Sequence, residues 1–198
     1  FDDPRIQRYI EVLEQKSMRL KTLTEDVVEA SKITSGNIKL ECMKLDFTEL
    51  VLQTSAEYEE KFEERNLTEI QHLPKEKALV YIDGRRTWRI LANLYNNAAK
   101  YAMTGSRIYT DLKVTEGAVI FSIKNISEQP LNINADQLTE RFIRGDISRS
   151  TEGSGLGLSI AQTLTEMQKG KFELYQDGDL FKATVTFPKV QEEQSTQI

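Results

Sequence analysis

The first 36 residues carry the pattern that most restricts how this chain folds. Apolar side chains recur every seven positions, at Ile6, Leu13, Leu20 and Val27. No residue between positions 5 and 34 interrupts a helix, and Gly36 is typical of a helix end. A single helix cannot bury such a stripe against itself, so it needs a partner helix, as in a coiled coil or a helical bundle. Packing against the chain's own remaining domain is the alternative.

The rest of the chain mixes helical and strand periodicity. An extended connection is expected at 37–48, followed by helices at 48–66, 84–103 and 158–168. Strands are expected at 67–73, 78–83, 107–114, 118–126, 171–176 and 180–187. The short turns TEG and DGD indicate two antiparallel hairpins. Helices segregated against such a sheet predict an α+β fold, a two-layer α/β sandwich preceded by one long helix.

Composition excludes several classes of function. The chain has 198 residues and a net charge of −5, which argues against a nucleic-acid surface. A single cysteine, Cys42, can form neither an intramolecular disulfide nor a zinc site. The only histidine, His72, is more typical of a surface or packing residue than of a catalyst. No apolar run spans a membrane, and a start without methionine favours a fragment whose membrane segment lies upstream.

The helix expected at 84–103 has two contrasting faces. One side is apolar, while Asn93, Asn96, Asn97 and Lys100 cluster on the other. Asparagine is a mediocre helix former, so this face is unfavourable unless it binds something. Amide oxygens suit Mg²⁺ shared with substrate phosphates, and a lysine suits a phosphate oxygen. The pattern alone leaves ligand binding and a solvated polar face equally open.

A glycine-rich loop opens the helix expected at 158–168. The sequence RSTEGSGLGLSIAQT places glycines at 153, 155 and 157. It follows no strand and lacks a Gly-Lys-Ser/Thr ending, so it fits neither a dinucleotide fingerprint nor a Walker loop. Backbone N–H groups at a helix start do bind phosphates. The polar stretch before it, 127–152, is long enough for a functional lid and contains Arg141, Arg144 and Arg149.

Four stretches of the sequence resemble parts of the sensor histidine kinases of two-component systems. NLYNNAAKY resembles their asparagine box, and RFIRGDISRS followed by GSGLGLSIAQ resembles their phenylalanine and second glycine boxes. EVLEQKSMRLKTLTEDVVEASKITSGNIKL resembles the second helix of their dimerisation and phosphotransfer domain. The resemblance covers about residues 5–188. It implies the Bergerat (GHKL) ATP-binding fold shared with Hsp90-type ATPases, topoisomerase II and MutL, in which ATP lies between the asparagine helix and a mobile lid.

The resemblance assigns roles on the asparagine helix. Asn97 would bind Mg²⁺ through its carbonyl oxygen, with Asn93 close by as a second metal ligand. Lys100 would contact phosphate, and Tyr101 would line the nucleotide site. ATP and Mg²⁺ are thus the expected cofactors, and Asn97, Lys100 and Arg144 are the expected catalytic residues.

The remaining expected contacts lie in the lid and its root. Phe142 would anchor the lid, and Arg144 would approach the phosphates. The three glycines, Gly153, Gly155 and Gly157, would let the backbone wrap the phosphates, with Leu156 packed beneath.

The chain departs from the family where adenine would bind. Relatives carry an Asp-x-Gly-x-Gly box after the strand at 118–126, whereas here Asn125 occupies the aspartate position and the glycines are absent. An asparagine still offers one carbonyl acceptor, so adenine recognition is expected to be weaker or differently arranged.

The phosphoacceptor histidine is also missing, since it belongs on a helix upstream of residue 1. The expected domains are a phosphotransfer helix at 1–36, a linker at 37–48, the ATP-binding domain at 49–190 and a disordered tail at 191–198. The expected partners are the upstream phosphoacceptor helix, a cognate response regulator and a second copy in the full-length protein. The resemblance places the chain in the cytoplasm, as part of a membrane-bound sensor. A degenerate module, acting as a phosphatase or partner-binding scaffold, and a plain dimeric coiled-coil protein with an α/β head are the alternatives.

Overall fold

The structure is a computed structural model that describes residues 4–35, 38–129 and 156–190. In chain order its elements are α1 (Pro4–Thr34), β1 (Met43–Asp46), α2 (Phe47–Glu63), β2 (Thr68–His72), β3 (Leu79–Ile82), α3 (Gly84–Tyr101), β4 (Arg107–Val114), β5 (Ala118–Ile126), α5 (Gly157–Met167), β6 (Lys171–Asp177) and β7 (Leu180–Pro188). Each helix and strand expected among these residues is present, which confirms the α+β class.

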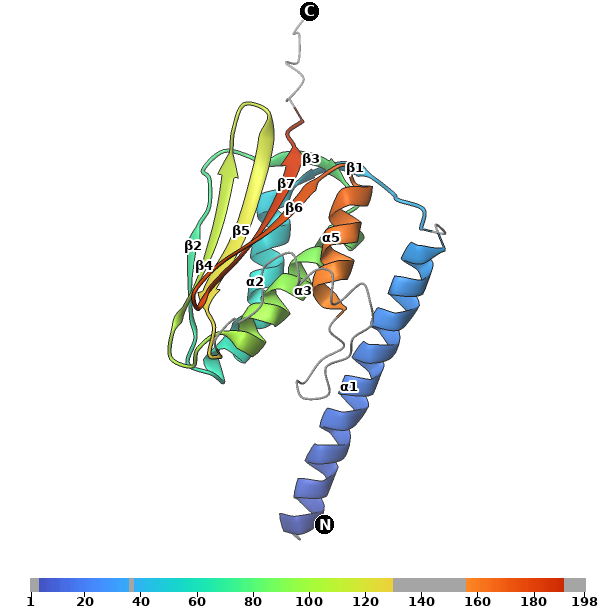
Figure 1. The fold of residues 1–198 in the computed structure, drawn as a ribbon, viewed down its shortest axis with the longest axis vertical. Helices are drawn as coiled ribbons and strands as arrows, with labels where there is room; N and C mark the ends of the chain where they lie inside the picture. Colours follow the sequence, from blue (N-terminus) through green and yellow to red (C-terminus); the bar gives the residue numbers. More distant parts are fainter. Residues whose placement is uncertain (1–3, 36–37, 130–155, 191–198) are drawn as a thin grey trace, which may run out of the picture.

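The main sheet has the strand order β2-β4-β5-β7-β6. Figure 1 shows α2, α3 and α5 together on one side of this sheet, and the expected two-layer sandwich is confirmed. The hairpins β4–β5 and β6–β7 pair antiparallel, as their turns predicted. The edge strand β2 instead pairs parallel to β4, through a connection that contains β3 and α3. This length of connection suits a crossover, so the sheet is mixed rather than purely antiparallel.

The segment expected to be a linker, 37–48, contains structured backbone. Within it, β1 pairs antiparallel with β3 in a small second sheet. The Asp46 side chain then caps α2 by accepting a hydrogen bond from the backbone N–H of Thr48 at 3.0 Å. The strand β1 and the start of α2 therefore pack with the α/β sandwich, although the division into domains stays a prediction.

The core lies between the sheet and its helices. Along β5 the buried side chains alternate, with Phe121 and Ile123 facing the helices. Phe121 lies 6.1 Å from Phe47 and 6.4 Å from Tyr95, measured between ring centroids. These rings join α2, α3 and β5 in one cluster, which holds α3 in place above the sheet.

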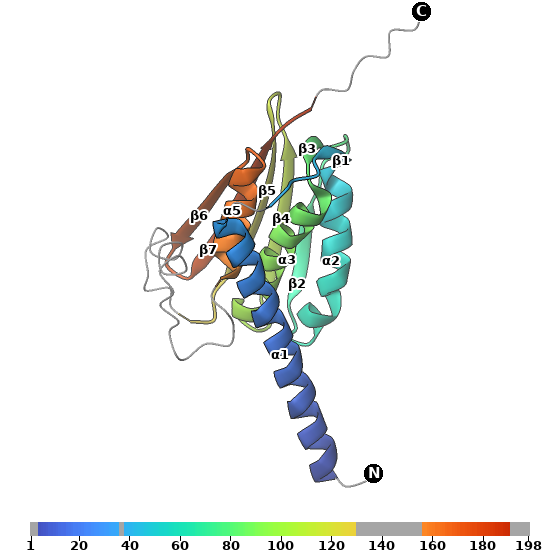
Figure 2. The ribbon, with the colours of Figure 1, turned by 90° about the vertical axis from the view of Figure 1, so that its right-hand side faces the viewer.

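The long helix α1 extends away from the sandwich, as Figures 1 and 2 show. Its apolar stripe stays exposed over most of its length, with 67% exposure at Leu13 and 66% at Leu20. Only its C-terminal part meets the sandwich, where Ile33 packs on the core. Within the described residues, nothing covers the stripe, which fits the expected need for a partner helix. None of the described helices has the length and apolarity required to cross a bilayer.

Candidate functional site

The asparagine helix α3 is oriented as its sequence predicted. Leu91, Leu94, Tyr95 and Ala98 are buried against the core. On the opposite side Asn93, Asn97 and Lys100 are partly exposed and Asn96 is exposed. The polar face therefore borders a surface that a ligand can reach.

Buried tyrosines fix α3 over the sheet. The Tyr95 hydroxyl donates to the Glu69 carboxylate at 2.8 Å, and Thr110 donates to the same oxygen at 2.6 Å. Burial first, and then the negative charge of Glu69, raise the pKa of Tyr95, so it remains a neutral donor. Tyr58 donates to the carbonyl of Ala92 at 2.9 Å, and burial raises the pKa of Tyr58 to about 12. Neither tyrosine ionises at neutral pH, so both anchors are permanent.

A buried glutamine sets the direction of α5 relative to α3. The Asp83 side chain caps α3 by accepting from the Arg86 N–H at 3.0 Å. The Asp83 N–H itself donates to the Gln168 side chain, just after α5, at 2.7 Å. Because the start of α3 meets the end of α5, the two helices run antiparallel, and the start of α5 lies beside the second half of α3.

The start of α5 contacts Asn93 directly. A Cβ added to Gly157 would lie 3.3 Å from the Asn93 Oδ1 atom, so only glycine fits without displacing the amide. Asn93 Nδ2 is buried and has no hydrogen-bond partner among the described residues. Among the described residues no side-chain hydrogen bond caps the N-terminus of α5, and the N-terminus of a helix favours the binding of an anion. The structure thus brings together the asparagine face and the end of the glycine loop, which the sequence had suggested separately.

Asn97 and Lys100 follow Asn93 along the same face, about one and two turns further on. The Lys100 ammonium lies 4.8 Å from the centre of the Tyr101 ring, and Tyr101 is 39% exposed. In the part of the chain that the structure describes, Lys100 makes no ion pair with a carboxylate. Its positive charge is therefore not neutralised by these residues.

Asn125 lies at the end of β5, on the side of the sheet that faces the helices. It is buried, and its Nδ2 donates to the Ile126 carbonyl at 3.2 Å. The same carbonyl accepts from the Met103 N–H at 2.8 Å, and the Glu128 N–H donates to the Tyr101 carbonyl at 2.9 Å. The strand end with Asn125 is thus joined to the end of α3. Leu156, partly buried against the core, lies directly before α5.

Four expected site residues, Phe142, Arg144, Gly153 and Gly155, lie outside the described residues. His72 is described, and it is exposed at the end of β2, where its Nδ1 lies 2.8 Å from Asp111 Oδ1. This position is on the side of the sheet that faces away from the helices, so His72 is remote from the asparagine face.

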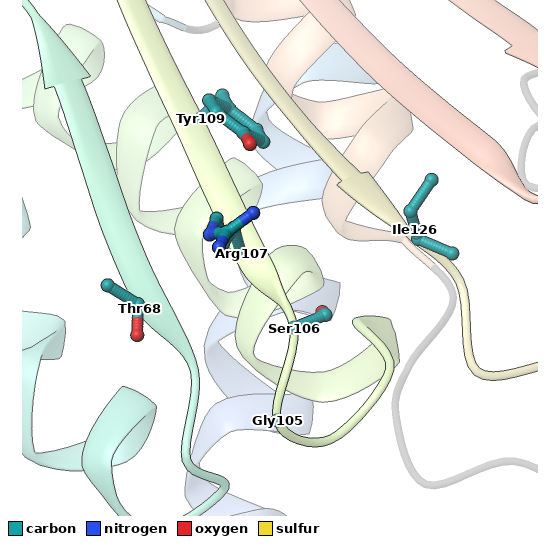
Figure 3. Close-up of a pocket in the computed structure, with 6 residues that line it drawn as sticks. All are labelled: Thr68, Gly105, Ser106, Arg107, Tyr109 and Ile126. Atoms are coloured by element: carbon teal, nitrogen blue, oxygen red, sulfur yellow. The ribbon is translucent and has the colours of Figure 1, made fainter.

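Two surface hollows of about 450 Å³ each occur elsewhere on the molecule. The first is drawn in Figure 3 and is lined by Thr68, Gly105, Ser106, Arg107, Tyr109 and Ile126. The second lies between α1 and α3. Neither is lined by the asparagines of α3. The chemistry of the asparagine face, rather than a hollow, therefore identifies the candidate site.

Sequence reasoning missed Arg65, whose guanidinium bonds to the carbonyls of Ala99 and Lys100 at 2.7 and 2.6 Å. Its neighbours come from distant parts of the chain, and an arginine at the end of a helix is too common to signal this contact.

The comparisons with known proteins agree with this geometry. The sequence model described as "Histidine kinase-, DNA gyrase B-, and HSP90-like ATPase" matches residues 82–194, more than half of the chain. The histidine protein kinase SaeS of Staphylococcus aureus is 30% identical over 195 residues, which cover 95% of this chain and 55% of SaeS. The chain spans about half the length of the curated relatives it matches.

Solved structures share the fold. Full-length ShkA in complex with AMPPNP superposes with a TM-score of 0.76 at 20% identity, covering 96% of this chain and 40% of ShkA. The histidine kinase ThkA in complex with the response regulator TrrA gives a TM-score of 0.70 at 23% identity, covering 96% of this chain and 53% of that one. The chain therefore belongs to the histidine kinase-, DNA gyrase B- and HSP90-like ATPase family, and its sandwich is a catalytic domain of the histidine kinase type.

Proposed function

We propose that this chain binds Mg-ATP between α3 and the start of α5, as the kinase part of a two-component sensor. The observation that carries the proposal is the contact of Gly157 with Asn93, whose buried Nδ2 lacks a partner among the described residues. An unpaired buried amide is unfavourable, so the site is built for a further polar group. The N-terminus of α5, and Lys100 on the same face of α3 as Asn93, suit that group being a phosphate.

The residues fit a magnesium ion as well. Asn97, with Asn93 close by, would hold Mg²⁺ through neutral amide oxygens, while the ion keeps waters and phosphate oxygens as its other ligands. When bound, Mg²⁺ neutralises charge that develops on the transferring phosphoryl group. Lys100 would hold a phosphate oxygen, and Tyr101 and Asn125 would line the adenosine side. Phe142, Arg144, Gly153, Gly155 and Leu156 would close the site as a lid and its root.

The proposed reaction is phosphoryl transfer to a histidine on a helix upstream of residue 1. The histidine nitrogen forms a bond to the γ-phosphorus, the bond from that phosphorus to the β,γ-bridging oxygen breaks, and ADP leaves. The protein's contribution is positioning and charge stabilisation, which is the usual division of work in phosphoryl transfer. His72 is remote from the site, so the chain alone is not expected to phosphorylate itself.

The proposed kinase function also implies partner proteins. We propose relay of the phosphoryl group to an aspartate of a response regulator, supported by the ThkA–TrrA complex. A second copy of the full-length protein and the upstream helix would cover the stripe of α1. The domain division at 1–36, 37–48, 49–190 and 191–198 belongs to this proposal. So does a cytoplasmic location as part of a membrane sensor, supported by relatives named sensor proteins.

A Mg-ATP titration by calorimetry tests the proposal. Asn97→Ala should weaken binding by at least about tenfold, because a metal ligand is lost. Asn96→Ala is the matched control, since Asn96 lies on the same helix but is more exposed than Asn93 and Asn97 and has no proposed ligand contact. It should bind like the unmodified chain. No binding by the unmodified chain at millimolar Mg-ATP, or equal binding by both variants, would refute the proposal. The first of these results would favour a degenerate scaffold.

A further inference from the structure

Arg65 connects three separate segments beside the candidate site. It lies just after α2, and its Nη1 donates to the carbonyls of Ala99 and Lys100 in the last turn of α3. Its Nη2 donates to the Thr104 hydroxyl at 3.2 Å and to the Glu128 carboxylate at 2.5 Å. A cation at the C-terminus of a helix is favoured by the exposed carbonyls and the helix dipole. One side chain thus joins the ends of α2 and α3 to residue 128.

The carbonyl of Ala99 depends on this contact. Its helical partner would be the Met103 N–H, but that group donates to the Ile126 carbonyl at 2.8 Å instead. Arg65 replaces the missing intrahelical bond with a charged donor at 2.7 Å. Without Arg65, the Ala99 carbonyl would lose this charged donor, in the turn that carries Lys100 and Tyr101.

The backbone of Arg65 is itself held on both sides. Its N–H donates to the Phe62 carbonyl at 3.2 Å, and its carbonyl accepts from the Gly105 N–H at 3.1 Å. Asn66, with φ of 52°, ends α2 in the left-handed region that asparagine tolerates. With 25% of its side chain exposed, Arg65 is largely packed. The guanidinium is therefore preorganised and not a loose surface charge.

We propose that Arg65 is a positioning residue for nucleotide binding. It fixes the last turn of α3 so that Lys100 meets a phosphate, and through Glu128 it fixes the first residues after β5, next to the 130–155 segment. This inference rests on the function proposed above. A plain helix cap would stabilise the fold without affecting how Lys100 contributes to binding, so the two roles are separable.

Mg-ATP affinity, measured beside thermal stability, tests the role. Arg65→Ala should weaken Mg-ATP binding by about fivefold. Arg65→Lys should give an intermediate loss, because an ammonium keeps the charge but not the fork that reaches two carbonyls. Asp46→Ala is the stability-matched control, since it removes the cap of α2 far from the site. It should lower the melting temperature and leave affinity within about twofold.

A double-mutant cycle with Lys100→Ala measures the coupling of the two side chains in Mg-ATP binding. A purely structural role of Arg65 would give no such coupling. If Arg65 acts through Lys100, adding Arg65→Ala to Lys100→Ala should weaken binding by less than about twofold. The inference is overturned if the affinity loss of the double variant equals the product of the two single losses, or if Arg65→Ala binds Mg-ATP with unchanged affinity. The proposed function stands in either case. If Arg65→Ala does not fold, the Mg-ATP affinity of Arg65→Lys is the test. An affinity equal to that of the unmodified chain then overturns the inference. Failure of the unmodified chain to bind Mg-ATP refutes the proposed function itself.

Discussion

At the scale of single residues, the outward face of the sheet carries a charge cluster that is unrelated to the candidate site. Asp111 on β4 accepts from Lys124 on β5 at 3.0 Å and lies 2.8 Å from the ring nitrogen of His72 on β2. Burial alone would raise the pKa of Asp111, but the hydrogen bonds from Lys124 and His72 outweigh it and lower the pKa below its usual value. The carboxylate therefore links three strands in its charged form.

Replacing Asp111 by Asn should change how stability depends on pH. Because the pKa of Asp111 is lower in the folded state, the charged carboxylate stabilises the fold at pH values above its unfolded-state pKa of about 3.9. This stability is lost as the pH falls through the folded-state pKa. Asp111→Asn should cost about 1 kcal/mol at pH 7, and the difference from the unmodified chain should shrink below about pH 4. Urea unfolding at pH 7 and pH 3 measures this, with the exposed Asp177→Asn as control. An equal difference at both pH values would contradict it.

At the scale of elements, local patterns predicted the helices and hairpins, but not the contacts between distant segments. The two faces of α3 were predictable because 18 residues show a clear helical period. The four-residue strand β1 and the parallel pairing of β2 with β4 depend on partners far along the chain. The same helical period predicted the polar face that carries Asn93, Asn97 and Lys100. Arg65 was not, because its partners lie between 34 and 63 residues away.

The contact between α3 and α5 predicts the effect of Gly157→Ala. Alanine is a better helix former than glycine by up to about 1 kcal/mol, so stability should hold or rise slightly. The added Cβ would nevertheless press on Asn93 Oδ1 at 3.3 Å and displace the amide. We expect Mg-ATP affinity to fall by about threefold to tenfold without a fall in the melting temperature. Gly117→Ala, where a Cβ meets nothing within 4 Å, is the control. Unchanged affinity would show that Asn93 plays no part in binding.

At the scale of the whole molecule, α1 is held against α3 by charges. Arg86 pairs with Glu29 at 2.6 Å, and Arg89 pairs with Asp26, which is 4% exposed. Figure 2 shows the end of α1 lying along the helical layer of the sandwich. Such shielded pairs are much less sensitive to salt than surface pairs, and breaking one leaves an uncompensated buried charge.

Arg89→Glu should release α1 from the sandwich. The new carboxylate faces Asp26 and Glu29, which replaces two attractions with repulsion and leaves charges buried at a penalty of about 3 kcal/mol or more. Small-angle X-ray scattering should show a larger radius of gyration, and adding Asp26→Arg should restore most of the compact form. Lys171→Glu, which breaks an exposed pair with Glu173, should leave the radius unchanged. An unchanged radius in Arg89→Glu would mean that apolar packing around Ile33, rather than these charges, fixes α1.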